Sequence, residues 1–392
     1  MSPRIRSADV LLVGAGQAGL SVAYHLRRTG FVPLPRNDDG VGAGSARSFV
    51  MVDANPGPGG AWRHRWDSLT MDRVNGIFDL PGMPREDVPP TRPSNLALPD
   101  YFGRFEERFG LGVERPVRVR SVEFEDPDDP RSWLRAELVD ADAPVSEQVS
   151  GDPTGIVRAR VLMNATGTWT KPFVPYVPGA ESFRGRQVHT VDYRRAEDFA
   201  GQRVAVVGGG ISALTFLLEI AEVGETLWFT RRPPEFHEGG FTAEHGREVI
   251  EKVTERARMG MAPQSVVAST ELRWTPELRR AQAAGILARR PMFRSIEPGG
   301  VRLADGSFEP VDAIVWATGF RWELGHLGPL HLRGRGGGIF LDPPMVADEP
   351  RVYLVGYGPS ASTVGANRAG RAAVTMAREY LGDREPQRGS AT

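Results

Sequence analysis

Two glycine-rich turns contain residue types that could bind a dinucleotide. The first is GAGQAG at residues 14–19, with the spacing G-x-G-x-x-G. In such a turn the first glycine permits the bend, the second lets the backbone approach a pyrophosphate, and the third lets helix and strand pack closely. The candidate binding residues here are Gly14, Gly16, Gln17 and Gly19.

The elements around this turn have the order that the dinucleotide fingerprint requires. An apolar run at residues 10–13 predicts a buried strand, and residues 20–28 predict a helix with an apolar face. The helix N-terminus offers N–H donors and a partial positive charge to phosphates. An ordinary tight turn between strand and helix is the alternative interpretation.

An acidic residue follows the next predicted strand, residues 49–52. Asp53 lies further from Gly19 than the roughly 20 residues of the standard motif, and a polar, glycine-rich insertion at residues 33–48 accounts for the excess. An acid at this place accepts hydrogen bonds from ribose hydroxyls and repels a 2′-phosphate. Asp53 therefore indicates FAD or NAD, and a solvated loop aspartate is the alternative.

The second glycine-rich turn is GGGISA at residues 208–213. It follows a predicted strand at residues 203–207 and precedes a predicted helix at residues 212–222. Its candidate binding residues are Gly208, Gly210, Ser212 and Ala213.

Two arginines follow the next strand, residues 226–230. Arg231 and Arg232 take the place that Asp53 takes in the first unit, close to the standard offset. Arginine there binds a 2′-phosphate and stacks on adenine, so the pair favours NADPH over NADH. A surface arginine pair is the alternative.

Further turns are expected to contact the nucleotides. Two A-T-G turns end buried strands, and a glycine turn before the last helix directs its N-terminus toward a ligand. A loop at residues 55–71 passes close to a flat ligand, although its tryptophans could be core residues, an alternative that is favoured for Trp66. The candidates are Gly60, Trp62, Thr70, Gly167, Gly319, Gly356 and Gly358.

The composition is that of an ordinary globular enzyme. The 392 residues are 40% apolar and 25% charged, with a net charge of −1, so no nucleic-acid footprint is visible. No apolar run reaches the length of a membrane span, and a cytoplasmic protein is expected. With no cysteine, a disulfide, a Cys-ligated metal and a redox C-x-x-C pair are excluded. No metal site is predicted.

Two fingerprints with opposite specificity residues predict two different nucleotides, FAD and NADPH. An enzyme that holds both transfers hydride from nicotinamide to flavin. Because a cysteine pair is absent, the electrons must pass to O₂, a quinone or dye, or a redox protein.

The chain resembles the class B flavin-dependent monooxygenases over residues 8–380. Besides the two fingerprints and the A-T-G turns, FRGRQVHTVDY at residues 183–193 fits F-x-G-x-x-x-H-x-x-x-Y, the form found in flavin-containing monooxygenases. The Baeyer–Villiger form ends in Trp followed by Pro or Asp, whereas here Arg194 follows Tyr193.

The resemblance implies that NADPH reduces FAD and that reduced FAD reacts with O₂ to a C4a-(hydro)peroxide. This species passes one oxygen to a small organic substrate, with N- or S-oxygenation preferred. The resemblance also makes His189 and Tyr193 candidate catalytic residues, and orientation of the interdomain linker is the favoured role of His189. Thr70 and Asn75 are candidates for a flavin contact, each with a structural turn as the favoured role.

The expected fold is α/β, with two Rossmann-like dinucleotide-binding domains. An NADPH domain at residues 171–311 is inserted into an FAD domain formed by residues 1–170 and 312–392. The rival functions are a Baeyer–Villiger monooxygenase, an NADPH oxidase or flavin reductase, and a non-enzymatic flavin-bound redox sensor. Neither the substrate nor the oligomeric state follows from the sequence.

Overall fold

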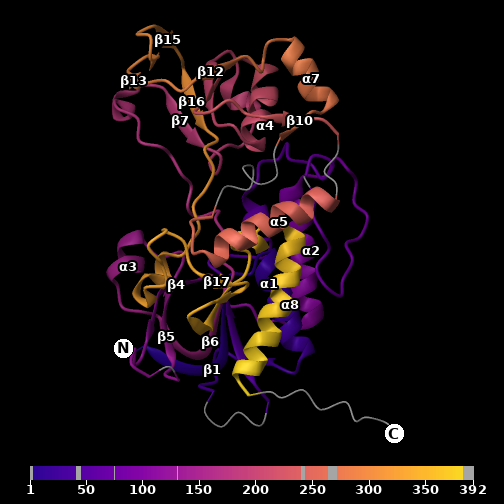
Figure 1. Ribbon diagram of the computed structural model, residues 1–392, viewed down its shortest axis with the longest axis vertical. Helices are drawn as coiled ribbons and strands as arrows, with labels where there is room; N and C mark the ends of the chain where they lie inside the picture. The colour runs from indigo at the N-terminus through magenta and orange to yellow at the C-terminus, as the bar shows by residue number, and fades with distance from the viewer. Residues whose placement is uncertain are drawn as a thin grey trace.

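The computed structural model describes residues 3–40, 46–74, 76–129, 131–239, 243–263 and 272–382. Most of their strands form a nine-stranded mixed sheet and a five-stranded parallel sheet, and the chain passes from the first to the second and back (Figure 1). The first sheet lies in the lower part of Figure 1 and the second in the upper part. The fold is thus mixed α/β, as the alternation of strands and helices predicts.

The first sheet has the strand order β17-β18-β19-β6-β1-β3-β2, with β5 and β4 continuing from β6. The strands β19, β6, β1, β3 and β2 are parallel, so their carboxyl ends lie at one edge. The bounds are β1 (Arg4–Val13), β2 (Val32–Pro33), β3 (Ser48–Val52), β4 (Val117–Phe124), β5 (Leu134–Asp140), β6 (Gly155–Asn164), β17 (Leu341–Asp342), β18 (Met345–Val346) and β19 (Glu349–Leu354).

Both faces of this sheet are covered, which explains why its central strands read as continuous apolar runs. Val10 and Leu12 face a core that they share with three helices, whereas Leu11 and Val13 face a core under β4 and β5. The helices are α1 (Gln17–Arg28), α2 (Ser94–Phe109) and α8 (Thr363–Tyr380). Helix α8 lies along α1 in Figure 1, where the yellow and indigo ends of the chain meet.

Helix α2 differs from the expectation for this region. The sequence predicts a short helix from residue 100 with Asp100 as its N-cap, but α2 begins at Ser94, after Pro93 at the N-cap, and includes Pro99. Pro93 at the N-cap removes no intrahelical hydrogen bond, whereas Pro99 lies inside the helix and removes one i→i−4 hydrogen bond. Asp100 instead pairs with Arg92.

The second sheet has the strand order β12-β9-β8-β16-β7, and all its pairings are parallel. The bounds are β7 (Arg186–His189), β8 (Arg203–Val207), β9 (Glu225–Thr230), β12 (Arg289–Pro291) and β16 (Ala313–Trp316).

The strand β16 corrects one expected boundary. The boundary expected at residue 312 assigns this strand to the FAD domain. In the structure, however, β16 lies between β8 and β7 in the second sheet. The chain therefore leaves the second sheet after residue 316. A short apolar strand followed by a glycine turn has the same pattern in either sheet, so the pattern alone does not show its partners.

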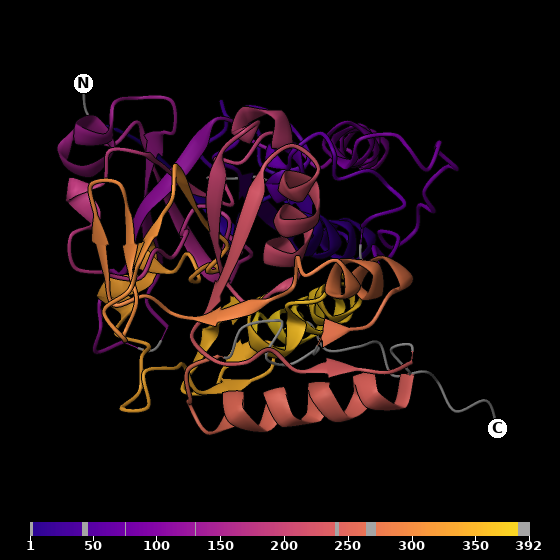
Figure 2. The ribbon, with the colours of Figure 1, turned by 90° about the horizontal axis from the view of Figure 1, so that it is seen from above.

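The second sheet also has two covered faces. Val204 and Val206 pack under α4 (Ile211–Ala221) and α7 (Pro276–Ala283), whereas Ala205 and Val207 pack under a small antiparallel sheet. That sheet consists of β13 (Ser295–Glu297), β14 (Gly300–Arg302) and β15 (Phe308–Pro310). Figure 2 shows this small orange sheet and α7 on opposite sides of the second sheet.

The remaining elements connect these units. Helix α5 packs against η5 and β17, so a helix encoded between strands of the second sheet lies on the first unit (Figure 1). No helix in the described ranges is long and apolar enough to cross a membrane. The bounds are η1 (Gly60–His64), α3 (Val145–Ser150), η2 (Ala180–Ser182), η3 (Ala196–Phe199), β10 (Phe236–His237), α5 (Ala243–Arg258), β11 (Leu272–Arg273), η4 (Gly325–Leu330) and η5 (Gly358–Ser360).

Candidate functional site

The first glycine turn is tightly packed at its ends and open at its centre. A Cβ at Gly14 would lie 2.5 Å from the Ala165 carbonyl oxygen, and one at Gly19 would lie 1.8 Å from that of Gly14. A Cβ at Gly16 would meet no described atom within 4 Å. Gly16 is the N-cap of α1, and no side chain caps this helix. The free N–H groups therefore face a place that an anionic ligand can reach.

The loop after β3 packs against one side of this turn. A Cβ at Gly60 would lie 2.8 Å from the Gly16 Cα, so only glycine allows this approach. Gly60 has φ +52°, and the loop continues into η1, which contains Trp62. Trp66 is 3% exposed and lies in the core of the second sheet, as favoured from the sequence.

Asp53 is buried where β3 ends, beside the first glycine turn. Its Oδ2 accepts a hydrogen bond of 2.6 Å from the Ala15 N–H, and its Oδ1 accepts one of 2.8 Å from the Asn55 N–H. Arg115 Nε lies 3.8 Å from Oδ1. The carboxylate thus holds the turn in shape, and it is not the solvated loop residue of the alternative interpretation.

The second glycine turn repeats this geometry. Gly208 has φ +146°, and a Cβ there would lie 2.2 Å from the Ala317 carbonyl oxygen. Gly210 is the uncapped N-cap of α4, so the first turn of α4, which contains Ser212, keeps its N–H groups free. Ala213 is fully buried, which is the close packing that the third position of the fingerprint needs.

Arg231 and Arg232 are exposed where β9 ends, near this second turn. Neither forms an ion pair with another residue of the described part of the chain, so both are available to an anion. A third arginine, Arg289, lies beside them on β12, and its Nε donates to Thr230 Oγ1 at 2.8 Å. Sequence reasoning missed Arg289 because only the pairing of β12 with β9 brings it there.

Two segments carry the chain between the sheets, residues 165–173 and 317–323, and together they are called the crossing. The Phe173 N–H donates to the Gly319 carbonyl at 3.0 Å, and the Arg321 N–H donates to the Lys171 carbonyl at 2.8 Å. The rings of Trp169 and Phe320 stack with centroids 5.2 Å apart. The second A-T-G turn and the residues after it are therefore bonded directly to the segment that follows the first A-T-G turn.

The glycines of these turns face open space. Gly167 has φ +66° and Gly319 has φ +80°, and a Cβ at either would meet no described atom within 4 Å. The last glycine turn lies on the first: a Cβ at Gly356 would lie 3.1 Å from the Ala18 Cβ, and Gly358 begins η5. Gly14, Gly60, Gly167 and Gly356 thus all belong to turns at one edge of the first sheet, where the parallel strands end.

His189 lies at the end of β7 and contacts the crossing. Its Nε2 is 3.0 Å from the Gly319 carbonyl oxygen, and its Nδ1 accepts a 3.4 Å hydrogen bond from the Val191 N–H. This arrangement is that of a neutral ring that donates from Nε2. Burial lowers the pKa of His189, which also favours the neutral form. The geometry supports a linker-orienting role for His189.

Tyr193 is fully buried in the core of the second sheet. Its hydroxyl donates to Glu219 Oε2 at 2.7 Å, and burial together with Glu219 raises its pKa. Glu219 Oε1 accepts a 2.8 Å hydrogen bond from Ser68 Oγ, and Arg73 lies 3.6 Å away. Glu219 therefore joins α4, the linker and the loop after Trp62, a role that the sequence did not reveal.

The other candidates lie in polar turns. Gln17 Nε2 donates to Asn367 Oδ1 at 3.1 Å and to the Phe78 carbonyl at 3.2 Å. Thr70 Oγ1 donates to Asp72 Oδ1 at 2.5 Å in an exposed turn, which is the structural role favoured for it. Asn75 lies outside the described residues. Within those residues, no group of three His, Cys, Asp or Glu could hold a metal ion.

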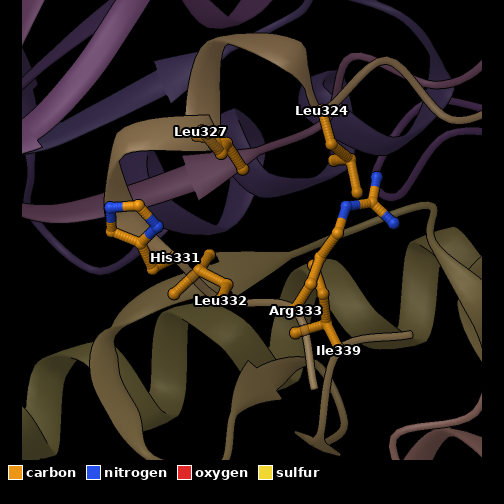
Figure 3. A pocket seen from close by; sticks show the side chains of 7 residues that line it. Leu324, Leu327, His331, Leu332, Arg333 and Ile339 are labelled. Carbon is orange, nitrogen blue, oxygen red and sulfur yellow. The ribbon is translucent and has the colours of Figure 1, made fainter. Parts of the chain in front are cut away.

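A separate pocket of about 220 Å³ lies at η4 and the segment after it (Figure 3). Four aliphatic side chains line it together with His331 and Arg333, and Figure 3 shows these side chains. Its lining contains no residue of the glycine turns or of the crossing. The aliphatic residues are Leu324, Leu327, Leu332 and Ile339.

Known proteins resemble this chain in sequence and fold. A family model described as pyridine nucleotide-disulphide oxidoreductase matches residues 137–358. The solved structure of a flavin-containing monooxygenase from Stenotrophomonas maltophilia is 31% identical, covers 96% of this chain and all of its own, and superposes with a TM-score of 0.73.

Two curated relatives agree with these matches. An uncharacterized CzcO-like oxidoreductase of Geobacillus kaustophilus is 26% identical, over 83% of this chain and 87% of its own. The indole-3-pyruvate monooxygenase YUCCA4 of rice (Oryza sativa subsp. japonica) is 27% identical, over 79% of this chain and 74% of its own.

These matches define first a two-nucleotide oxidoreductase that lacks the cysteines of disulfide chemistry. The chain belongs to the class B flavin-dependent monooxygenases within this larger family. It is an NADPH-dependent oxidoreductase that uses FAD and O₂. The helices that begin after Gly16 and Gly210 both have N-termini without a side-chain cap, and Gly16 faces open space.

Tyr193→Phe tests whether the tyrosine hydroxyl acts in packing or in chemistry. The variant leaves Glu219 Oε2 without a donor in a buried core, so we expect it to lower the free energy of unfolding by about 1.5–3 kcal/mol. FAD reduction by NADPH should continue. Urea unfolding and rapid-mixing absorbance measure the two quantities.

Tyr176→Phe is the matched control, because Tyr176 is 89% exposed. Unchanged stability together with a more than ~100-fold slower reduction would show that the Tyr193 hydroxyl takes part in the chemistry.

Proposed function

We propose that the first glycine turn binds FAD, that the second binds NADPH, and that the enzyme inserts one oxygen atom from O₂ into a small organic substrate. N- or S-oxygenation is the preferred reaction. The observation that carries this proposal is the pair of glycine turns before uncapped helix N-termini at the carboxyl ends of parallel strands, one with Asp53 beside it and the other with Arg231 and Arg232.

The proposed domains follow the sheets. An FAD domain consists of residues 1–170 together with the chain after the crossing, and an NADPH domain lies between them. Its end belongs after β16 because this strand pairs with β8. In this arrangement the crossing is the hinge region, and its stacked Trp169 and Phe320 hold the two nucleotide sites in a fixed relative position.

Each group of residues has a distinct role in the proposal. The free N–H groups of α1 and α4 bind the two pyrophosphates, and Asp53 fixes the first turn. Arg231 and Arg232 bind the 2′-phosphate, with Arg289 beside them. His189 and Tyr193 position the linker. Bound FAD supplies hydride acceptance and oxygen activation, while the chain orients the ligands and excludes water.

The function is tested by comparing NADPH consumed, oxygenated product formed and peroxide released by the FAD-loaded enzyme. We expect NADPH to bleach the flavin without O₂ and, in air, a thioether or amine to be oxygenated with most electrons recovered in product. Peroxide as the main product with every substrate of the panel would indicate an oxidase. A flavin that NADPH does not reduce would contradict an enzymatic role.

The nucleotide assignment is tested with the variant Arg231→Ala/Arg232→Ala. Loss of two charge-assisted contacts to the 2′-phosphate should raise KM for NADPH by about 10- to 100-fold, and KM for NADH by less than about threefold. Steady-state oxidation of both nucleotides measures this. The control Arg184→Ala removes another exposed arginine. The hydrogen bond of Arg184 to the Pro298 carbonyl comes from its backbone N–H, so it is kept in the variant. Equal increases for the two nucleotides would show that the pair does not bind the phosphate.

A further inference from the structure

The side chain of Arg65 is surrounded by three tryptophans, which are called the tryptophan cage. Its Cζ lies 4.3 Å from the ring centroid of Trp169, 5.5 Å from that of Trp62 and 6.0 Å from that of Trp66. Indole faces attract a guanidinium but accept no conventional hydrogen bond from it. The three rings therefore provide no hydrogen-bond acceptor for the guanidinium.

Arg65 has no carboxylate partner within the described ranges. Its Nε is buried and lacks any hydrogen-bond acceptor, and its guanidinium enters no ion pair there. Burial lowers the pKa of Arg65 to about 10, so the group is still charged at neutral pH. A desolvated cation without a counter-charge is costly, and an arriving anion would offset that cost.

The tryptophan cage lies where the functional turns meet. Trp62 follows Gly60, which lies against Gly16, and Trp169 follows the open turn at Gly167. Trp169 also stacks on Phe320, next to the open turn at Gly319. Arg65 is thus placed at the junction of the two sheets, where a substrate must meet the cofactors of the proposed function.

We propose that Arg65 binds the carboxylate of the organic substrate, so that the enzyme acts on small carboxylic acids with an apolar or aromatic remainder. The guanidinium fork matches a planar carboxylate in a bidentate pair, and the indole rings pack against the remainder. The nucleotide phosphates have other partners in the proposed function, namely the helix N-termini and Arg231 with Arg232. This inference rests on the proposed function, because it names the substrate class of the same site.

The test uses two probes that differ in charge, 4-(methylthio)benzoate and 4-(methylthio)benzamide. Calorimetry on the FAD-loaded enzyme should show that the benzoate binds at least about tenfold more tightly, since a charge-assisted pair discriminates by this factor or more. Arg65→Met should remove the preference while leaving benzamide binding within about twofold. Arg65→Lys, which keeps the charge without the fork, should retain part of it.

The control Arg321→Met removes another stacked arginine, which lies 4.3 Å over Phe173 but is exposed. It should keep the full preference. Equal affinities of the wild-type enzyme for both probes would overturn the proposal, whatever the stability of the variants. So would a preference that survives Arg65→Met, or an Arg65→Met variant that loses affinity for NADP⁺ and not for the benzoate.

Binding and turnover separate this inference from the proposed function. If the benzoate preference depends on Arg65 but neither probe nor methyl phenyl sulfide yields a sulfoxide, the oxygenation assignment fails and the carboxylate site stands. If methyl phenyl sulfide is oxygenated but the benzoate preference is absent, the carboxylate site fails and the oxygenation assignment stands.

Discussion

The carbonyl oxygen of Gly319 is the acceptor on which the junction of the two sheets depends. It receives the Phe173 N–H at 3.0 Å and lies 3.0 Å from His189 Nε2. This one carbonyl of the segment 317–323 thereby contacts both the segment 165–173 and the end of β7. The left-handed conformation of Gly319, φ +80°, directs this carbonyl while its Cα faces open space. Any side chain here would be strained and would occupy that space.

In the proposed function, the position of the crossing allows one chain to serve two nucleotides. Parallel strands collect their loops at one edge, so each sheet presents a glycine turn and a specificity residue together. The stack of Trp169 on Phe320 and the bonds of Gly319 join those two edges, and Glu219 adds a second connection through Ser68 and Tyr193. Hydride transfer needs such fixed geometry, because a displacement of about 1 Å can cost 10²-fold in rate.

The features that the sequence predicted well are those encoded locally. The glycine spacing at residues 14–19 and 208–213 predicted two tight turns between strand and helix, and the positive φ and close contacts of Gly14 and Gly208 agree with that prediction. Apolar runs located the strands β1, β3, β8 and β9, and Trp66 was correctly expected in the core. The motif at residues 183–193 placed His189 at the linker, where the structure gives it a contact with Gly319.

The features that the sequence did not predict depend on contacts between distant positions. Glu219 looks like one polar residue on an apolar helix, and its partners Ser68 and Tyr193 lie 151 and 26 positions away. The sheet membership of β16 depends on pairing, which a four-residue apolar run does not specify. Arg65 stands in the string WRHRW, but only the fold brings Trp169 next to it. The sequence also does not show that Arg65 Nε lacks a hydrogen-bond partner among the described residues.

The central claim is that the crossing couples the two nucleotide sites, and His189→Ala tests it most directly. The FAD-to-protein ratio, NADPH oxidation and product yield of the purified variant are compared with those of the wild-type enzyme. The account predicts that the variant retains FAD while its coupled turnover slows, because Gly319 loses one of its two partners. Unchanged NADPH oxidation and unchanged product yield would contradict the account.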